Sequence, residues 1–135
     1  MHDTDERFDL AERTKAFALR VMRLFCALPK STQAQVIGKQ VLRSGTSVGA
    51  NYREARRSRS KAEFLAKVGD CLKELDETAY WLELLSESDI VSAPKLEPLQ
   101  NETEQLLAIF TTIAKKTKRA TPAAKVATGE ALQNS

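Results

Sequence analysis

Apolar residues recur at alternating spacings of three and four in four separate segments of the chain. The pattern is strictest in the third segment, where the apolar positions are Leu65, Val68, Leu72, Leu75, Ala79 and Leu82. This spacing places apolar side chains along one face of an α-helix, and that face has to be buried against other helices. Four such segments therefore predict an all-α fold with one shared core.

The expected helices span about residues 6–28, 32–58, 60–87 and 94–118. Ser60 followed by Glu63 matches the capping box that starts a helix, and Pro94 suits a first helical turn. Helices of similar length joined by short connections predict an antiparallel up-down-up-down four-helix bundle in residues 1–119. Residues 120–135 contain a proline and few large apolar side chains, so we expect a disordered tail there.

The length of 135 residues suits one domain with a single core. Cys26 and Cys71 both lie within apolar helical patterns, which indicates small buried hydrophobes in a reducing compartment and not a disulfide framework. The N-terminal residues lack the basic and apolar regions of a signal peptide, and no apolar run approaches the roughly 20 residues of a membrane span. We therefore expect a cytoplasmic protein with no membrane association.

Charge is divided along the chain more sharply than the net charge of +3 indicates. Residues 30–67 hold nine basic and two acidic side chains, a net charge of +7, whereas residues 68–110 hold two basic and ten acidic side chains, a net charge of −8. Surfaces of opposite sign could meet between copies of the chain, and head-to-tail contacts of this kind close into rings. One hypothesis is therefore a self-associating protein.

The most distinctive feature is a dense basic stretch near the predicted junction of the second and third helices. Its members are Arg53, Arg56, Arg57, Arg59 and Lys61, and Arg43 lies about three turns upstream. Arginine presents a planar fork of donors that suits phosphate oxygens, so the stretch is a candidate nucleic-acid-binding surface. The alternative interpretation is a helix junction whose basic side chains contact water and bind no ligand.

Small and polar residues also follow one face of the second segment. They are Ser44, Ser47, Asn51 and Glu54, with Gly45 and Gly49 beside them. Glycine inside a helix lowers stability by about 1 kcal/mol relative to alanine, so close packing against another helix or subunit is expected to compensate. A ligand pocket around Asn51 and Glu54 is the alternative.

Tyr80 and Trp81 are adjacent in the third segment, so one of them is a candidate for a subunit contact.

Catalytic and metal chemistry are not expected. The only histidine is His2, near the N-terminus, so neither a di-iron carboxylate site nor a histidine-assisted nucleophile can be assembled. No glycine-rich phosphate loop is present. We expect a protein that is not an enzyme and that needs no metal and no cofactor.

The stretch from residue 41 to residue 85 resembles the four-helix bundle proteins encoded in intervening sequences of bacterial 23S ribosomal RNA genes. The resemblance lies in Arg43-Ser44-Gly45-Thr46-Ser47-Val48-Gly49-Ala50-Asn51-Tyr52-Arg53-Glu54-Ala55, in Lys61-Ala62-Glu63-Phe64-Leu65 and in Cys71-Leu72-Lys73-Glu74-Leu75. It implies a left-handed bundle that assembles into a homopentameric ring. Related bundles include the accessory variability determinant of diversity-generating retroelements, a ring-shaped partner of a reverse transcriptase that binds nucleic acid.

Together these features predict a non-enzymatic, ring-forming bundle that binds RNA or DNA through a basic surface, with structured RNA favoured. The alternative is an interaction scaffold that recruits a protein partner and does not touch nucleic acid.

Overall fold

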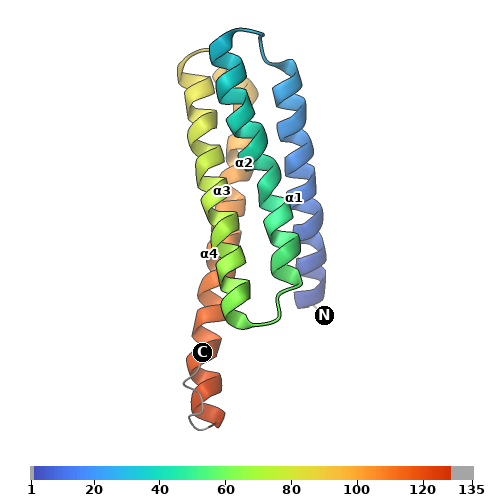
Figure 1. Cartoon of the computed structure of the whole chain (residues 1–135), viewed down its shortest axis with the longest axis vertical. Helices are drawn as coiled ribbons and strands as arrows, with labels where there is room; N and C mark the ends of the chain where they lie inside the picture. The colour runs from blue at the N-terminus through green and yellow to red at the C-terminus, as the bar shows by residue number, and fades with distance from the viewer. Residues whose placement is uncertain (1, 129–135) are drawn as a thin grey trace.

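The computed structural model describes the backbone of residues 2–128 and the side chains of residues 9–120. This part of the chain forms four helices, α1 (His2–Ala27), α2 (Thr32–Arg56), α3 (Lys61–Glu87) and α4 (Ala93–Thr128). Helices that follow one another in the chain pack side by side and run in opposite directions, with α1 and α3 on either side of α2 (Figure 1). The predicted all-α, up-and-down arrangement is confirmed.

Serine side chains start two of the helices. The Oγ atom of Ser31 accepts a hydrogen bond from the backbone N–H of Ala34, at 3.3 Å, at the start of α2. At the start of α3, Ser60 Oγ accepts from the N–H of Glu63 and Glu63 Oε1 accepts from the N–H of Arg59, both at 3.0 Å. The cap predicted at Ser60 is therefore present, with Glu63 accepting from the residue before the N-cap, and the two bonds fix the turn between α2 and α3.

The last helix is longer than the sequence pattern indicated. The backbone of α4 remains helical to Thr128, past the predicted end near residue 118. Four alanines, at positions 120, 123, 124 and 127, favour a helix in this stretch because alanine has the highest helix propensity. Residues 129–135 of the expected disordered tail lie outside the described part of the chain.

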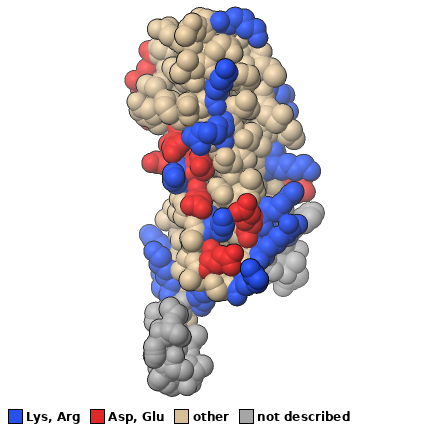
Figure 2. All heavy atoms as spheres, viewed as in Figure 1, with Lys and Arg blue, Asp and Glu red and all other residues tan. Residues whose placement is uncertain are grey.

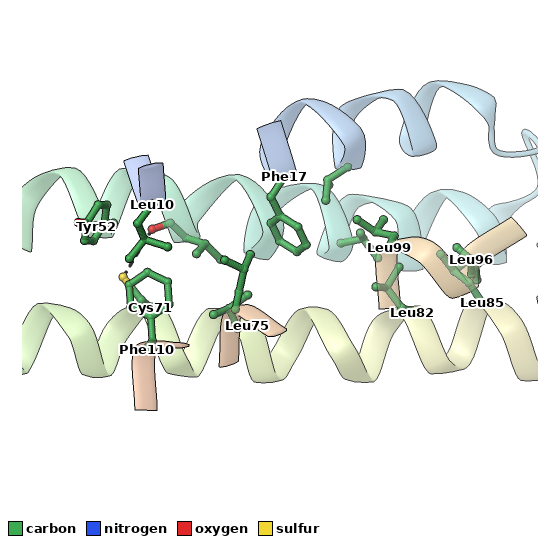
Figure 3. Packing of buried hydrophobic residues seen from close by; sticks show 14 of the residues in the cluster. Leu10, Phe17, Tyr52, Cys71, Leu75, Leu82, Leu85, Leu96, Leu99 and Phe110 are labelled. Atoms are coloured by element: carbon green, nitrogen blue, oxygen red, sulfur yellow. Dashed lines mark hydrogen bonds between the residues drawn. The ribbon is translucent and has the colours of Figure 1, made fainter. Parts of the chain in front are cut away.

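All four helices contribute large side chains to one core. Phe17 of α1, Tyr52 of α2, Leu75 of α3 and Phe110 of α4 are each at most 2% exposed (Figure 3). Burial of an apolar side chain of this size contributes about 1.5–3 kcal/mol. None of the helices, over the described residues, is apolar over a length that would cross a membrane.

The two cysteines differ in environment, so the expectation that both are buried was wrong. Cys71 is buried, and its Sγ atom lies 3.5 Å from the backbone oxygen of Val48 in α2. Cys26 is exposed. It falls between Val21 and Leu28, which are the core positions in this part of α1, and this spacing turns its side chain to the outside of the bundle.

Small side chains allow α2 to pack closely against both of its neighbours. A Cβ atom placed on Gly45 would lie 2.7 Å from Val21 Cγ2 of α1, and one on Gly49 would lie 3.3 Å from Thr14 Oγ1. On its other side, the buried hydroxyls of Ser44 and Thr78 of α3 share a hydrogen bond of 2.7 Å. Close backbone approach therefore compensates for glycine inside this helix.

Among neighbouring helices, α1 and α4 approach each other least closely. Arg13 bridges them by donating to both carboxylate oxygens of Glu102, at 2.8 and 3.1 Å, and this interaction raises the pKa of Arg13. Beside the bridge lies a hollow of about 630 Å³ whose apolar walls include Leu10, Phe64 and Ile109. The Arg13–Glu102 pair thus connects the two helices where apolar contact is sparse.

The close packing predicts opposite effects for two Gly→Ala substitutions. Gly45→Ala should lower the free energy of unfolding, because overpacking against buried Val21, about 1–3 kcal/mol, outweighs a propensity gain of about 1 kcal/mol. Gly69→Ala is the matched control, since a Cβ atom on exposed Gly69 meets no atom within 4 Å, and it should raise the free energy of unfolding by about 1 kcal/mol. Urea denaturation at low protein concentration measures both effects. Stabilisation by both substitutions would contradict the close contact at Gly45.

The buried thiol gives a second prediction. Burial raises the pKa of Cys71 to about 12, so little of the reactive thiolate is present at pH 8. In a Cys26→Ser variant, Cys71 should react with a disulfide reagent on the order of 1000-fold more slowly in the native protein than in urea, where an ordinary pKa near 8.5 applies. Labelling time courses at pH 8 provide the measurement. Rapid native labelling would show that the contact between α2 and α3 opens readily.

Candidate nucleic-acid interface

A groove of about 600 Å³ runs between α1 and α2 toward the turn that joins α2 to α3. Its lips carry small residues, including Ala18 of α1 and Gly49 and Ala50 of α2. Its cationic side chains are Lys15, Arg53, Arg56 and Arg57. We call this feature the basic groove. It combines three arginines of the predicted basic stretch with a lysine from the neighbouring helix.

The side chain of Arg56 and the backbone of Arg57 each make a defined contact. The guanidinium of Arg56 lies 5.9 Å from the centre of the Tyr52 ring, a cation–π contact that favours one placement of the side chain. Tyr52 is itself fixed, because its ring is buried and packs edge-on against Phe110 at 5.6 Å. The backbone N–H of Arg57 caps the end of α2 by donating to the carbonyl oxygens of Glu54 and Ala55.

Acidic side chains offset only part of this charge. Glu54 forms an ion pair of 2.6 Å with Lys67 of α3, and this contact raises the pKa of Lys67. Glu12 also borders the groove. Within the described residues, neither Arg53 nor Arg57 forms an ion pair. The basic groove therefore keeps exposed guanidinium groups that can bind an anion.

The remaining members of the predicted set lie in other places. Arg59 is in the turn after α2 and Lys61 is the first residue of α3, so both lie at the same end of the bundle as the basic groove. Arg43 lies about 15 Å further along α2, at about 1.5 Å per residue. Its guanidinium pairs with Glu74, at 3.2 Å, and with Glu77 of α3, and the hydrogen bond to Glu77 raises its pKa. The structure thus does not bring Arg43 together with the groove.

Sequence reasoning missed two sources of positive charge. One is Lys15, which faces α2 across the groove. The other is the distal part of α4, which carries exposed Lys115, Lys116, Lys118 and Arg119. Up-and-down topology gives α2 and α4 the same direction, so this cluster lies near the end of α2; the contact between Tyr52 and Phe110 sets the level. Figure 2 shows basic side chains along the lower right side and again at the base of the bundle. The net charge of residues 111–135, taken with the topology, would have indicated this cluster.

The candidate packing and contact residues fall into three places. Ser44, Gly45 and Gly49 contact α1 or α3, as described above, and Ser47 donates its hydroxyl to the backbone oxygen of Arg43, at 2.7 Å. Asn51 is half-buried and Glu54 pairs with Lys67. Tyr80 is 53% exposed, whereas Trp81 packs partly against the core.

The indole of Trp81 carries a buried N–H group with no hydrogen-bond partner among the described residues. The Trp81 ring contacts the Tyr80 ring edge-on, with 5.0 Å between the ring centres.

Within the described residues, no three side chains of His, Cys, Asp or Glu gather closely enough to hold a metal ion.

These features define the class of protein: an up-and-down four-helix bundle with a basic groove beside the turn between α2 and α3. The family model described as 23S rRNA-intervening sequence protein matches residues 6–112, and the chain belongs to this family. The family inferred from the motif in residues 41–85 is thereby confirmed.

A solved structure supports the same assignment. It is the crystal structure of a protein of unknown function from the S23 ribosomal protein family of Bacteroides thetaiotaomicron. The two sequences are 36% identical, the match covers 81% of this chain and 97% of the other, and the TM-score is 0.76. No curated protein matches the chain.

Proposed function

We propose that this protein is a non-enzymatic bundle that binds nucleic acid, with structured RNA favoured, through phosphate groups in the basic groove. The observation that carries the proposal is the convergence of Lys15, Arg53 and Arg57 on one groove without an ion-pair partner among the described residues. Arg56, Arg59 and Lys61 lie at the same end and add to the positive potential there. Arginine forks bind phosphate oxygens in two-point contacts that a single ammonium group does not make.

The groove favours phosphates over bases. Base stacking needs an accessible aromatic face, but Tyr52 is 2% exposed and Arg56 lies over its ring. Phosphate contacts give affinity and orientation with little sequence preference. The choice of RNA rests on the description of the family, which refers to 23S rRNA, and on the resemblance to nucleic-acid-binding bundles of retroelements.

The second part of the proposal is assembly into a ring, with the homopentamer that the family resemblance implies. The part of the charge division between residues 30–67 and 68–110 that ion pairs within the chain leave unneutralised supports a head-to-tail contact. A ring would also repeat the basic groove around its circumference. Several grooves would then engage one nucleic acid together, which raises the overall affinity without any new kind of contact.

A protein-interaction scaffold is the competing function. It is favoured by the large apolar side chains on the surface, among which Val36 is 58% exposed and Tyr80 is 53% exposed. Exposed apolar surface on a bundle is often the site where a partner protein binds. Salt-dependent binding of an oligonucleotide separates the two functions, because a scaffold of this kind would bind none.

The test is a titration of a labelled RNA hairpin, followed by fluorescence anisotropy at 50 and 200 mM salt. The wild-type protein should bind more weakly at the higher salt concentration, since phosphate contacts release counterions. Arg53→Gln with Arg57→Gln should reduce the slope of log affinity against log salt by about 2, one unit for each lost contact. Absence of binding at 50 mM salt would contradict the proposal and favour the scaffold.

Two matched substitutions serve as controls on α2. Glu54→Gln removes a negative charge from the groove and frees Lys67, so it should strengthen binding, the opposite of the result for the arginines. Arg43→Gln removes a positive charge that is already paired with α3, so it should change the affinity least. Equal losses of RNA affinity for Arg43→Gln and Arg53→Gln would mean that binding depends on the overall charge of the protein and not on the basic groove.

A further inference from the structure

The outward face of α3 contains a glycine that packing within the chain does not explain. Gly69 is exposed near the middle of the helix, and a Cβ atom on it would meet nothing within 4 Å. Gly45 and Gly49 of α2, by contrast, lie against α1. A glycine in a helix interior is unfavourable by about 1 kcal/mol unless something approaches its backbone closely. No residue in the described part of the chain fills the space beside Gly69.

The same face carries acidic and aromatic side chains. Gly69, Lys73, Asp76, Tyr80 and Glu83 follow one another at spacings of four and three, and all are exposed. We call this set the α3 outer stripe. It bears two acidic residues and one basic residue around Tyr80, and none of its charged members forms an ion pair among the described residues.

The outward face of α1 carries apolar side chains and a net charge opposite in sign to that of the α3 outer stripe. Glu12, Lys15, Leu19, Met22 and Cys26 share one helical face with Arg23 at its edge, and all are exposed. We call this set the α1 outer stripe. Leu19 is 44% exposed and Met22 is 46% exposed, so two large apolar side chains stand next to each other in solvent. The stripe bears two basic residues and one acidic residue.

The two stripes point away from each other. The helices α1 and α3 lie on opposite sides of α2 (Figure 1), and each stripe lies on the side of its helix remote from the core. A contact between the α1 outer stripe of one copy and the α3 outer stripe of another therefore leaves one free stripe on each copy. Such a contact is head-to-tail, and it closes into a ring when the rotation between copies closes.

Contacts within the chain show that the stripes are also level. The close approach of Val21 and Gly45, next to the hydrogen bond between Ser44 and Thr78, places Val21 of α1 at the height of Thr78 of α3. Met22 is therefore about level with Tyr80. A closed ring has no shift along its axis, so with that axis along the bundle Met22 of one copy meets Tyr80 of the next.

The side chains that meet when Met22 is level with Tyr80 are chemically complementary near this centre. A methionine sulfur at the edge of an aromatic ring is a favourable contact. Arg23 comes within about one turn of Asp76 and Glu83, and Glu12 comes within about one turn of Gly69 and Lys73. Unlike charges thus lie beside the apolar centre on the Arg23 side. On the other side Glu12 lies near Lys73, but Lys15 comes level with Lys73 and the two repel, so the register depends mainly on Arg23 and the apolar centre.

We propose that the α1 outer stripe of one copy docks on the α3 outer stripe of a second copy, with Leu19 and Met22 against Tyr80. This inference rests on the proposed ring and adds the two surfaces that form it. The contact shares Glu12 and Lys15 with the rim of the nucleic-acid groove between α1 and α2 and leaves Arg53, Arg56 and Arg57 outside.

The experiment uses two variants that each remove one stripe. Met22→Glu alters the α1 outer stripe and Tyr80→Glu alters the α3 outer stripe, and circular dichroism checks that both still fold. Light scattering of the protein without nucleic acid should give an assembly for the wild type and a single-chain mass for each variant alone. An equimolar mixture should give the mass of two chains and no more, because one intact pair of stripes remains and the two glutamates repel each other.

Val36→Glu is the matched control, since Val36 is an exposed apolar residue of α2 outside both stripes, and it should leave the assembly unchanged. A wild-type protein that stays monomeric at about 100 μM would overturn both the ring and the stripes. A wild-type assembly that survives Met22→Glu and Tyr80→Glu would overturn the stripes alone. Neither result depends on the RNA titration, so failure of nucleic-acid binding is detected separately.

Discussion

The close packing of α2 against α1 and α3 is the contact on which the other features of this bundle depend. Gly45 brings the backbone of α2 against Val21 on one side, and Ser44 joins Thr78 through a buried hydrogen bond on the other. These contacts fix the level of three helices at once. A larger residue at position 45 would separate α2 from α1, and an unpaired hydroxyl at position 44 or 78 would be costly to bury.

The basic groove follows from this level. With Gly49 against Thr14, Lys15 comes to face the end of α2, where Arg53 lies and which Arg57 directly follows. The cap at Ser60 then ends the turn and holds Arg59 at the same end of the bundle. The motif that identifies the family is thus mainly a packing device, and the cations that we propose bind phosphate lie at its end and beyond it.

The division of charge in the sequence is partly neutralised within the chain. Arg43 of the basic block pairs with Glu74 and Glu77 of the acidic block, and Lys67 pairs with Glu54 across the same contact between α2 and α3. Such exposed pairs add little to stability because water and salt screen them. What remains unpaired is basic beside α1 and mostly acidic on the outside of α3, so the charges available to other molecules are fewer than the sequence count indicates.

The sequence alone determined the helices, the cap at Ser60 and the family, because these depend on residues within a few turns of one another. It also identified Arg53, Arg56 and Arg57 as a cationic group. It could not determine that Cys26 is exposed or that Arg43 forms ion pairs. It also could not determine that Lys15 and the end of α4 add positive charge at the end of the bundle that carries the basic groove. Those facts depend on the rotation and level of each helix relative to the others. Only tertiary contacts such as Gly45 with Val21 and Tyr52 with Phe110 fix these two quantities, because the residues that form them are far apart in the chain.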